Sequence, residues 1–303
     1  MKAVLEILTI QLTILIMIAI GFAVTKAGFF SAKTRADLTD LSINIILPCS
    51  ILSAFNRTAT PDLLRQSAIV LIVAFGLQLL AFILNLFVYK KIPDNRSAIM
   101  KHGMISNNAS FMGFPIIGAV FGPTGVLFGS IFLIPMRILM WTSGLSLFTE
   151  AGGKQKLKML LSHPCIWSVF VGFAYMFVPF ELPQFIWNAI TYIGDCARVL
   201  PMLIVGSILS GIKLKDMLDL QCYFYSFFRL IAIPAVLFVV LMLLKVDELV
   251  RNVAVLSSAM PTAITTVMLA DKYDKDAAFA SKLVVVSTIL SIATLPVLTL
   301  FLK

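Results

Sequence analysis

The stretch Lys101–Thr142, KHGMISNNASFMGFPIIGAVFGPTGVLFGSIFLIPMRILMWT, decides how this chain folds. It is mostly apolar, and a short turn at Gly122–Gly125 divides it into two candidate membrane spans. Gly113-Phe114-Pro115 should break the first span, because proline has no N–H and clashes with the carbonyl four residues earlier. In lipid, such a break survives only where protein or a water-filled cavity covers the freed backbone groups. We therefore expect a broken helix whose interruption faces the protein interior.

The composition of the whole chain is that of an integral membrane protein. Of its 303 residues, 60% are hydrophobic and 13% are charged, whereas soluble domains have about 25% charged residues. The net charge of +9 comes mainly from basic residues between apolar segments, so membrane topology explains it better than nucleic-acid binding. The four cysteines lack metal-binding spacing, and His102 and His163 are expected to flank spans on the cytoplasmic side. We predict neither a metal nor a cofactor.

Ten apolar segments are candidates to cross the bilayer core, which takes about 20 residues per helix. They lie near 4–24, 38–55, 66–89, 98–121, 124–148, 164–179, 185–210, 220–244, 250–270 and 278–301. Lysine and arginine concentrate in the odd-numbered connections, so the positive-inside rule places those connections in the cytoplasm and both termini outside. The sequence predicts an all-α, multi-pass protein of the cytoplasmic (inner) membrane.

Two halves of five spans, residues 1–150 and 164–303, flank a basic connection at 151–163. An odd number of spans in each half forces the halves into opposite orientations, as in an inverted repeat. Prolines recur at matched places: Pro48 and Pro201 in the second span of each half, Pro115 and Pro261 in the fourth. We expect the first pair to act as scaffold or hinge prolines and the second pair to mark two broken helices.

Several motifs together resemble the auxin efflux carrier family, including its bacterial malonate-carrier type. They are Asn108-Ala-Ser-Phe111-Met-Gly113-Phe-Pro115, Ala259-Met260-Pro261-Thr262-Ala263, Leu269-Ala270-Asp271-Lys272-Tyr273, Ser287-Thr288 with Ser291, Pro201 with Val205-Gly206-Ser207, and Asn44 with Pro48. The resemblance covers nearly the whole chain. It implies ten helices in an inverted five-helix repeat similar to NhaA-type and bile-acid-transporter folds, with the fourth and ninth helices crossing near the bilayer midplane at their prolines. It also implies transport of organic anions, commonly carboxylates, by a moving bundle of the third to fifth and eighth to tenth spans.

A broken helix offers a way to hold an anion without a formal cation. The N-terminus of a half-helix presents free N–H groups and roughly half a positive charge, and Pro115 and Pro261 each suit the first turn of a second half-helix. We expect Asn108 to contact substrate, because it matches the family asparagine. The other candidates near the breaks are Asn107, Phe111, Gly113, Ser257, Ser258 and Thr262. The alternatives are plain kinks at the prolines and serine hydroxyls bonded within their own helix.

Charged residues inside the predicted spans are stable only when they are paired or functional. Arg137 lies near the middle of the fifth span, where the family usually has a neutral polar residue, and could bind a second carboxylate bidentately. Asp195 and Arg198 stand three residues apart on the seventh span, so they could pair with each other or take part in coupling. Arg229 lies nearer the cytoplasmic end and is expected to snorkel to the interface.

These features favour a secondary transporter that moves a small organic anion, a carboxylate or dicarboxylate, by alternating access. A sodium- or proton-coupled carrier of the same fold is the alternative, and a membrane receptor or scaffold is the alternative outside transport. An intramembrane aspartyl protease needs two membrane aspartates, and Asp195 is the only deep one, so we predict no enzymatic activity. The expected partners are the anion and the lipid bilayer; a proton, sodium and a homodimer stay open, and nucleic acid is not expected.

Overall fold

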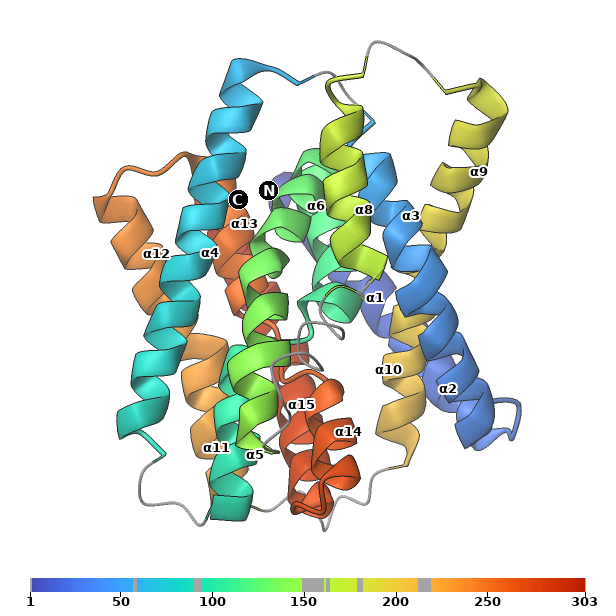
Figure 1. The fold of residues 1–303 in the computed structure, drawn as a ribbon. Coiled ribbons are helices and arrows are strands. Elements are labelled where there is room, and N and C mark those ends of the chain that lie inside the picture. The colour runs from blue at the N-terminus through green and yellow to red at the C-terminus, as the bar shows by residue number, and fades with distance from the viewer. Residues whose placement is uncertain are drawn as a thin grey trace.

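The computed structural model describes residues 2–56, 59–89, 94–148, 161, 164–178, 182–211 and 219–302, and these are almost entirely helical. Long helices run side by side between the two ends of the molecule (Figure 1). Among the described residues, six helices are long and apolar enough to cross a membrane. They are Lys33–Ala54, Pro61–Phe87, Phe114–Leu147, Gln184–Ser207, Leu220–Leu243 and Ala277–Phe301. The all-α class predicted from the sequence is confirmed.

The N-terminal part consists of helices interrupted by π-turns and a 3₁₀ turn. Its elements are α1 (Lys2–Lys26), α2 (Ala32–Leu41), the π-turn η1 (Ser42–Ile46), α3 (Leu47–Ala54), α4 (Pro61–Phe87), α5 (Asp94–Ile105), the π-turn η2 (Ala109–Gly113), α6 (Phe114–Leu139), the π-turn η3 (Met140–Gly144) and the 3₁₀ turn η4 (Leu145–Leu147). Side-chain oxygens of Ser31 and Thr60 accept N–H groups at the starts of α2 and α4, which caps both helices. Pro48 is the second residue of α3, where its missing N–H is not needed.

The C-terminal part shows the same kind of interrupted helices. Its elements are α8 (Pro164–Tyr175), α9 (Gln184–Asp195), the 3₁₀ turn η5 (Cys196–Arg198), α10 (Leu200–Ser210), α11 (Leu220–Phe227), the π-turn η7 (Phe228–Ala232), α12 (Ile233–Leu243), α13 (Glu248–Ser258), α14 (Thr265–Lys272) and α15 (Ala277–Phe301). Pro201 is the second residue of α10 and follows η5 closely. Apart from residue 161, the predicted basic connection at 151–163, with His163, lies outside the described residues.

The turn predicted at Gly122–Gly125 is present inside the segment named α6. Gly122 has φ 63° and ψ −161° there, a conformation that residues with a Cβ atom rarely adopt. The two arms of α6 fold back against each other, because a Cβ atom added at Gly129 would lie 3.3 Å from Cδ1 of Ile117. A glycine in this turn therefore lets the chain reverse direction within a few residues.

The helices pack around α6, which contacts α4 and α13, while α1 packs along α10 and α3 packs against α8 and α9. Glycines bring some of these backbones very close together. A Cβ atom at Gly206 would lie 2.0 Å from the Ile18 carbonyl oxygen, and one at Gly21 would lie 2.2 Å from the Leu203 carbonyl oxygen. Small residues at such positions are typical of helix pairs in membranes.

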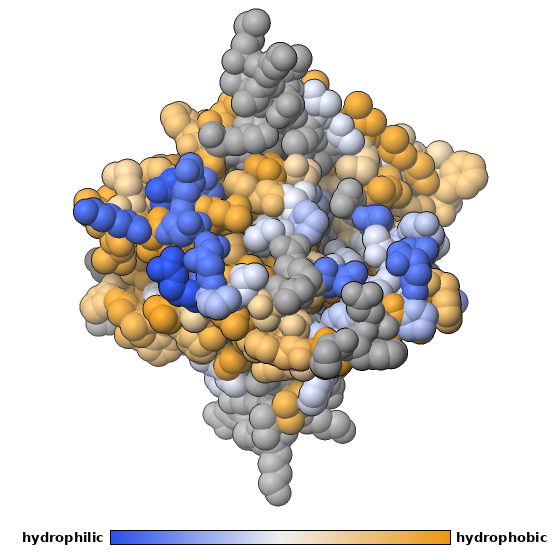
Figure 2. Space-filling model, turned by 90° about the horizontal axis from the view of Figure 1, so that it is seen from above, coloured by the Kyte–Doolittle hydropathy of each residue, from blue (hydrophilic) through white to orange (hydrophobic). Residues whose placement is uncertain are grey.

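The periphery of the molecule is strongly apolar. Large side chains such as Phe87, Phe185 and Leu220 are 74%, 73% and 83% exposed. Seen from above, the rim is mostly hydrophobic, and hydrophilic residues gather in patches on the end face (Figure 2). Apolar surface on this scale is not stable in water. The chain is therefore an integral membrane protein.

The helix ends that flank four of the connections predicted to be basic share one side of the molecule. The facing ends of α1 and α2, α4 and α5, α10 and α11, and α14 and α15 all lie at the lower end in Figure 1. Lys26, Arg96 and Lys275 lie at or near these helix ends. The two ends of the chain lie in the upper part of the same view.

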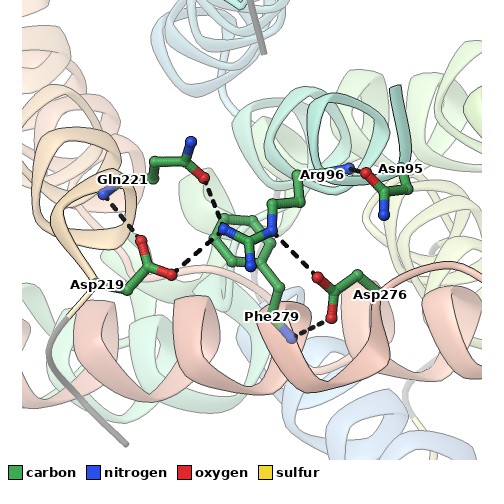
Figure 3. A network of polar contacts seen from close by, with 6 residues as sticks. All are labelled: Asn95, Arg96, Asp219, Gln221, Asp276 and Phe279. Atoms are coloured by element: carbon green, nitrogen blue, oxygen red, sulfur yellow. Dashed lines mark hydrogen bonds and ion pairs between the residues drawn. The ribbon is translucent and has the colours of Figure 1, made fainter. Parts of the chain in front are cut away.

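Arg96, in the first turn of α5, joins three helices at this lower end (Figure 3). Its Nε atom lies 3.1 Å from Oδ2 of Asp276, and its Nη1 atom lies 3.1 Å from Oε1 of Gln221 and 3.5 Å from Oδ2 of Asp219. The guanidinium also stacks on the Phe279 ring, 4.6 Å from its centroid. Because the two aspartates cap α11 and α15, Arg96 fixes the starts of α5, α11 and α15 relative to one another.

Candidate functional site

Two helices are interrupted where they meet inside the molecule. One interruption, residues 106–108, separates α5 from η2, and the other, residues 259–264, separates α13 from α14. The two non-helical segments lie antiparallel and form an isolated β-bridge between Asn107 and Thr262. The Asn108 N–H donates to the Pro261 carbonyl at 2.7 Å. Backbone groups that have no helical partner in one segment are thus hydrogen-bonded to the other segment. A membrane interior requires such partners, because it contains no water to supply them.

The first interruption lies about two helical turns before Gly113-Phe114-Pro115, so the predicted position of the break is wrong. Gly113 ends η2, and Pro115 is the second residue of α6. The π-turn ahead of Pro115 accommodates its missing N–H without unwinding the helix. Pro261 also differs from expectation, because it lies in the non-helical segment between α13 and α14 and not in the first turn of α14. Gly113 still faces the second interruption: a Cβ atom there would lie 3.5 Å from Cγ of Met260.

Asn107 and Asn108 differ in what their side chains do. The Asn107 amide donates from Nδ2 to the Ser257 carbonyl at 2.6 Å, and its Oδ1 accepts the Ala109 N–H at 3.3 Å. Asn108 is only 4% exposed, yet its side-chain amide has no hydrogen-bond partner among the described residues. Asn107 therefore holds the crossing together, whereas the amide of Asn108 is left for another partner.

Ser257 and Ser258 end α13 just before the second interruption, and both are fully buried. The Ser258 hydroxyl donates to the Val255 carbonyl of its own helix at 2.7 Å. The Ser257 hydroxyl has no partner within the described part of the chain. Of the two serines, Ser257 has the hydroxyl that a ligand could still use.

Thr262 is held by side chains from two other helices. Its hydroxyl donates to the Tyr225 hydroxyl at 3.0 Å, and its N–H donates to Oγ of Ser287 at 3.2 Å. The Tyr225 ring lies against Gly103 of α5, where an added Cβ atom would be 2.6 Å from the hydroxyl oxygen. Thr262 thus fixes the second interruption to α11 and α15, and a small residue at Gly103 makes room for that contact.

Gly103→Ala is expected to destabilise the protein by about 1–3 kcal/mol, because the added methyl group displaces the Tyr225 hydroxyl from Thr262. The measurement is the melting temperature of the purified protein in detergent. Gly76→Ala on α4 is the control, because a Cβ atom there meets nothing within 4 Å. Equal melting temperatures for both variants would show that Gly103 is not needed for this contact.

Arg137, on the second arm of α6, points toward the first interruption. Its Nη2 atom donates to the hydroxyl of Ser110, a buried residue of η2 that lies two positions after Asn108. The arginine also lines a cavity between α3, α6 and α8, together with Ile51 and Cys165. The structure thus places the cationic side chain of Arg137 beside η2, the turn that directly follows the crossing.

A second cavity, of about 160 Å³, lies between α3, α6 and α9. Pro115, Asp195 and Ser50 are among its lining residues, and its volume admits several water molecules. The side chains of Arg198 and Phe111 lie outside the described part of the structure, so the pairing of Arg198 with Asp195 and the contact of Phe111 with substrate stay predictions. Within the described residues, no cluster of histidine, cysteine and carboxylate side chains is suited to hold a metal ion.

Two residues expected near the membrane surface are buried. His102 is fully buried in α5, where its Nδ1 atom lies 2.9 Å from the Thr266 hydroxyl, so it does not flank a span. Arg229 is 2% exposed and does not snorkel, because its position in the helix faces inward. The signal for Arg229 was present in the sequence: Cys222, Tyr225, Ser226 and Arg229 follow the spacing of one helical face, and all four are buried.

Comparison with known proteins decides the family. The family described as membrane transport protein matches residues 7–161 and 153–299 of this chain. The chain belongs to this family, the auxin efflux carriers. The resemblance predicted from the sequence motifs is thereby confirmed.

Relatives of this auxin efflux carrier family member are named as transporters. An uncharacterized transporter of Methanothermobacter thermautotrophicus is 26% identical over 94% of this chain and 95% of its own length. An uncharacterized transporter of Methanocaldococcus jannaschii is 22% identical over 93% and 94%, respectively. A protein of Rhizobium meliloti named "Putative malonate transporter" is 22% identical over 92% and 90%. Family and relatives together identify a membrane transport protein.

Proposed function

We propose that this auxin efflux carrier family member is a secondary transporter that moves a small carboxylate or dicarboxylate across the cytoplasmic membrane by alternating access. The observation that supports this most directly is the antiparallel crossing of two interrupted helices, beside which the side-chain amide of Asn108 has no hydrogen-bond partner among the described residues. Interrupted helices that meet in this way are typical of transporter binding sites. The name of the Rhizobium relative, which mentions malonate, favours a dicarboxylate.

The proposed architecture has ten spans in two inverted halves, residues 1–150 and 164–303. Both halves contain a helix interrupted at the crossing, which supports the repeat. Both also contain a proline at the second position of a helix that follows an irregular turn, Pro48 after η1 and Pro201 after η5, and we assign these as hinges of the scaffold. The shared side of the helix ends that flank four of the basic connections supports a cytoplasmic position for these connections, with both termini outside.

The substrate site of this proposal lies at the start of η2. A half-helix N-terminus supplies N–H groups and roughly half a positive charge, which stabilise one carboxylate next to Asn108. Arg137, bonded to Ser110 two residues further on, would bind the second carboxylate of a dicarboxylate. The Ser257 hydroxyl, which has no partner among the described residues, comes from the end of α13 just before the other interruption. Gly113 and Pro115 shape the backbone here, and Pro261 and Thr262 do so on the other side.

Transport by the purified protein in liposomes tests this function directly. Uptake of labelled monocarboxylates and dicarboxylates of two to six carbons is measured, and the same compounds are screened for their effect on the melting temperature. At least one carboxylate should be taken up above the level of protein-free liposomes and should raise the melting temperature. If no carboxylate does either, the proposed substrate class is wrong.

Coupling to protons is the second candidate, because Asp195 lines the cavity of about 160 Å³ beside Pro115, which has room for several water molecules. Asp195→Asn is expected to make uptake independent of pH over the range in which uptake by the wild-type protein changes, since the amide cannot release a proton. The measurement is the initial uptake rate at several pH values. Asp62→Asn, in the first turn of α4, is the control, and an unchanged pH profile for Asp195→Asn would remove Asp195 from coupling.

A further inference from the structure

Arg229 is a buried cation whose partners are backbone carbonyls. It lies in η7, between α11 and α12, and its Nη1 atom donates to the Met104 carbonyl at 3.0 Å, while its Nε atom donates to the Met260 carbonyl at 3.2 Å. No carboxylate of the described residues pairs with it. A buried charge needs a counter-charge, so these carbonyls must provide it.

The two carbonyls belong to equivalent ends of the two interrupted helices. Met104 is in the last turn of α5, and Met260 follows the end of α13 by two residues. The last carbonyls of a helix have no partner within that helix and together bear roughly half a negative charge. Two such ends side by side amount to about one negative charge, which a single guanidinium offsets.

Three other carbonyls around these ends also have partners. The Ser257 carbonyl accepts from the Asn107 side chain, the Pro261 carbonyl from the Asn108 N–H, and the Ser106 carbonyl from the Ala263 N–H. Arg229 thus adds the Met104 and Met260 carbonyls to those that are hydrogen-bonded on this side of the crossing. In transporters with broken helices, unwound carbonyls and half-helix C-terminal ends are also the groups that coordinate sodium.

We propose that Arg229 is the resident cation of this crossing and takes the position at which a coupling sodium ion would neutralise the carbonyl ends. This inference rests on the proposed anion transport, and it specifies that such transport needs no sodium. Arg229 acts as a positioning residue, because it holds the two interruptions together and does not contact the anion. The carbonyl side of the crossing is then permanently neutralised, and the amide side is left to bind substrate.

The wild-type protein gives the first test. Initial uptake of a transported carboxylate is compared in sodium, potassium and choline buffers with all gradients otherwise equal, and the rates should agree within about twofold. An obligatory need for sodium would overturn the role of Arg229 and leave the proposed anion transport intact. If no carboxylate is transported at all, the proposed function fails instead, and the stability test below still judges Arg229.

Removing the guanidinium should create a dependence on added cations. Arg229→Ala is expected to lose uptake on the order of tenfold or more in choline buffer, with partial recovery in sodium or guanidinium chloride. Its melting temperature should also rise with sodium or guanidinium relative to choline at equal ionic strength, whereas that of the wild type should not. Arg229→Lys retains the charge and is expected to remain independent of sodium in both measurements, which keeps the test valid if the alanine variant does not fold.

Arg96→Ala is the matched control, because Arg96 also joins α5 to α11, but through side chains at the molecular surface. It is expected to lower the melting temperature without any dependence on the cation present. If Arg229→Ala folds and has a lower melting temperature that does not depend on the cation, as expected for Arg96→Ala, then Arg229 has only a structural role and the proposal is wrong. If Arg229→Lys becomes sodium-dependent, a resident charge at this position does not replace sodium, and the proposal is equally wrong.

Discussion

Asn108→Ala is expected to reduce carboxylate uptake 10- to 100-fold, roughly the factor that corresponds to one lost hydrogen bond to a charged group. The melting temperature should stay close to that of the wild type. The reason is that the Asn108 amide has no hydrogen-bond partner among the described residues, so its removal breaks no internal contact. The backbone bond from Asn108 to Pro261, which joins the two interruptions, is unaffected by the substitution.

Asn107→Ala is the matched control for this result. It removes the bonds to the Ser257 carbonyl and the Ala109 N–H, and leaving both groups buried without partners should cost about 1–3 kcal/mol for each. The expected pattern is therefore opposite: the melting temperature falls for Asn107→Ala and uptake falls for Asn108→Ala. If Asn108→Ala melted early and kept normal uptake, Asn108 would be a structural residue and would leave the proposed site.

The class of the fold and the existence of the two interruptions could be predicted from the sequence, because their signals are local. Apolar segments identify membrane helices, and glycine with proline marks the turn at Gly122 and the disturbed helices around Pro115 and Pro261. The exact position of the first break could not be predicted from the local signal. Residues 106–108 unwind because a segment about 150 positions away offers hydrogen bonds to them, and local sequence contains no information about that partner.

The different roles of neighbouring residues at the site could not be predicted from the local sequence either. Asn107 and Asn108 are the same residue type side by side, and only the position of Ser257 decides which amide is used internally. The burial of Arg229 depends on which face of its helix turns inward. The sequence contained a signal for that face, because Cys222, Tyr225, Ser226 and Arg229 follow the spacing of one helical face. In most membrane helices the inward face is harder to recognise, because lipid-facing and core-facing residues are both apolar.

Arg137→Gln is expected to affect dicarboxylates far more than monocarboxylates. The guanidinium lies beside Ser110 at the start of η2, so in the proposed site it meets the carboxylate that Asn108 and the half-helix N-terminus do not bind. A charge-assisted bidentate contact contributes about 1.5–3 kcal/mol, so the KM for a dicarboxylate should rise on the order of 10- to 100-fold. For a monocarboxylate of similar length, the KM should change by less than about threefold, because that substrate makes no contact with Arg137.

Two further variants separate binding from support of the fold. Arg137→Lys retains the charge and loses the planar guanidinium fork. Its KM for a dicarboxylate should therefore lie between that of the wild type and that of Arg137→Gln. Ser110→Ala removes the group that holds the guanidinium in place and should weaken dicarboxylate uptake less than Arg137→Gln does. The ratio of dicarboxylate to monocarboxylate uptake is the decisive quantity, because a loss of fold or of bundle motion lowers both rates together. An unchanged ratio in Arg137→Gln would therefore assign Arg137 to the packing of α6 against η2 and leave the second carboxylate without a cationic partner.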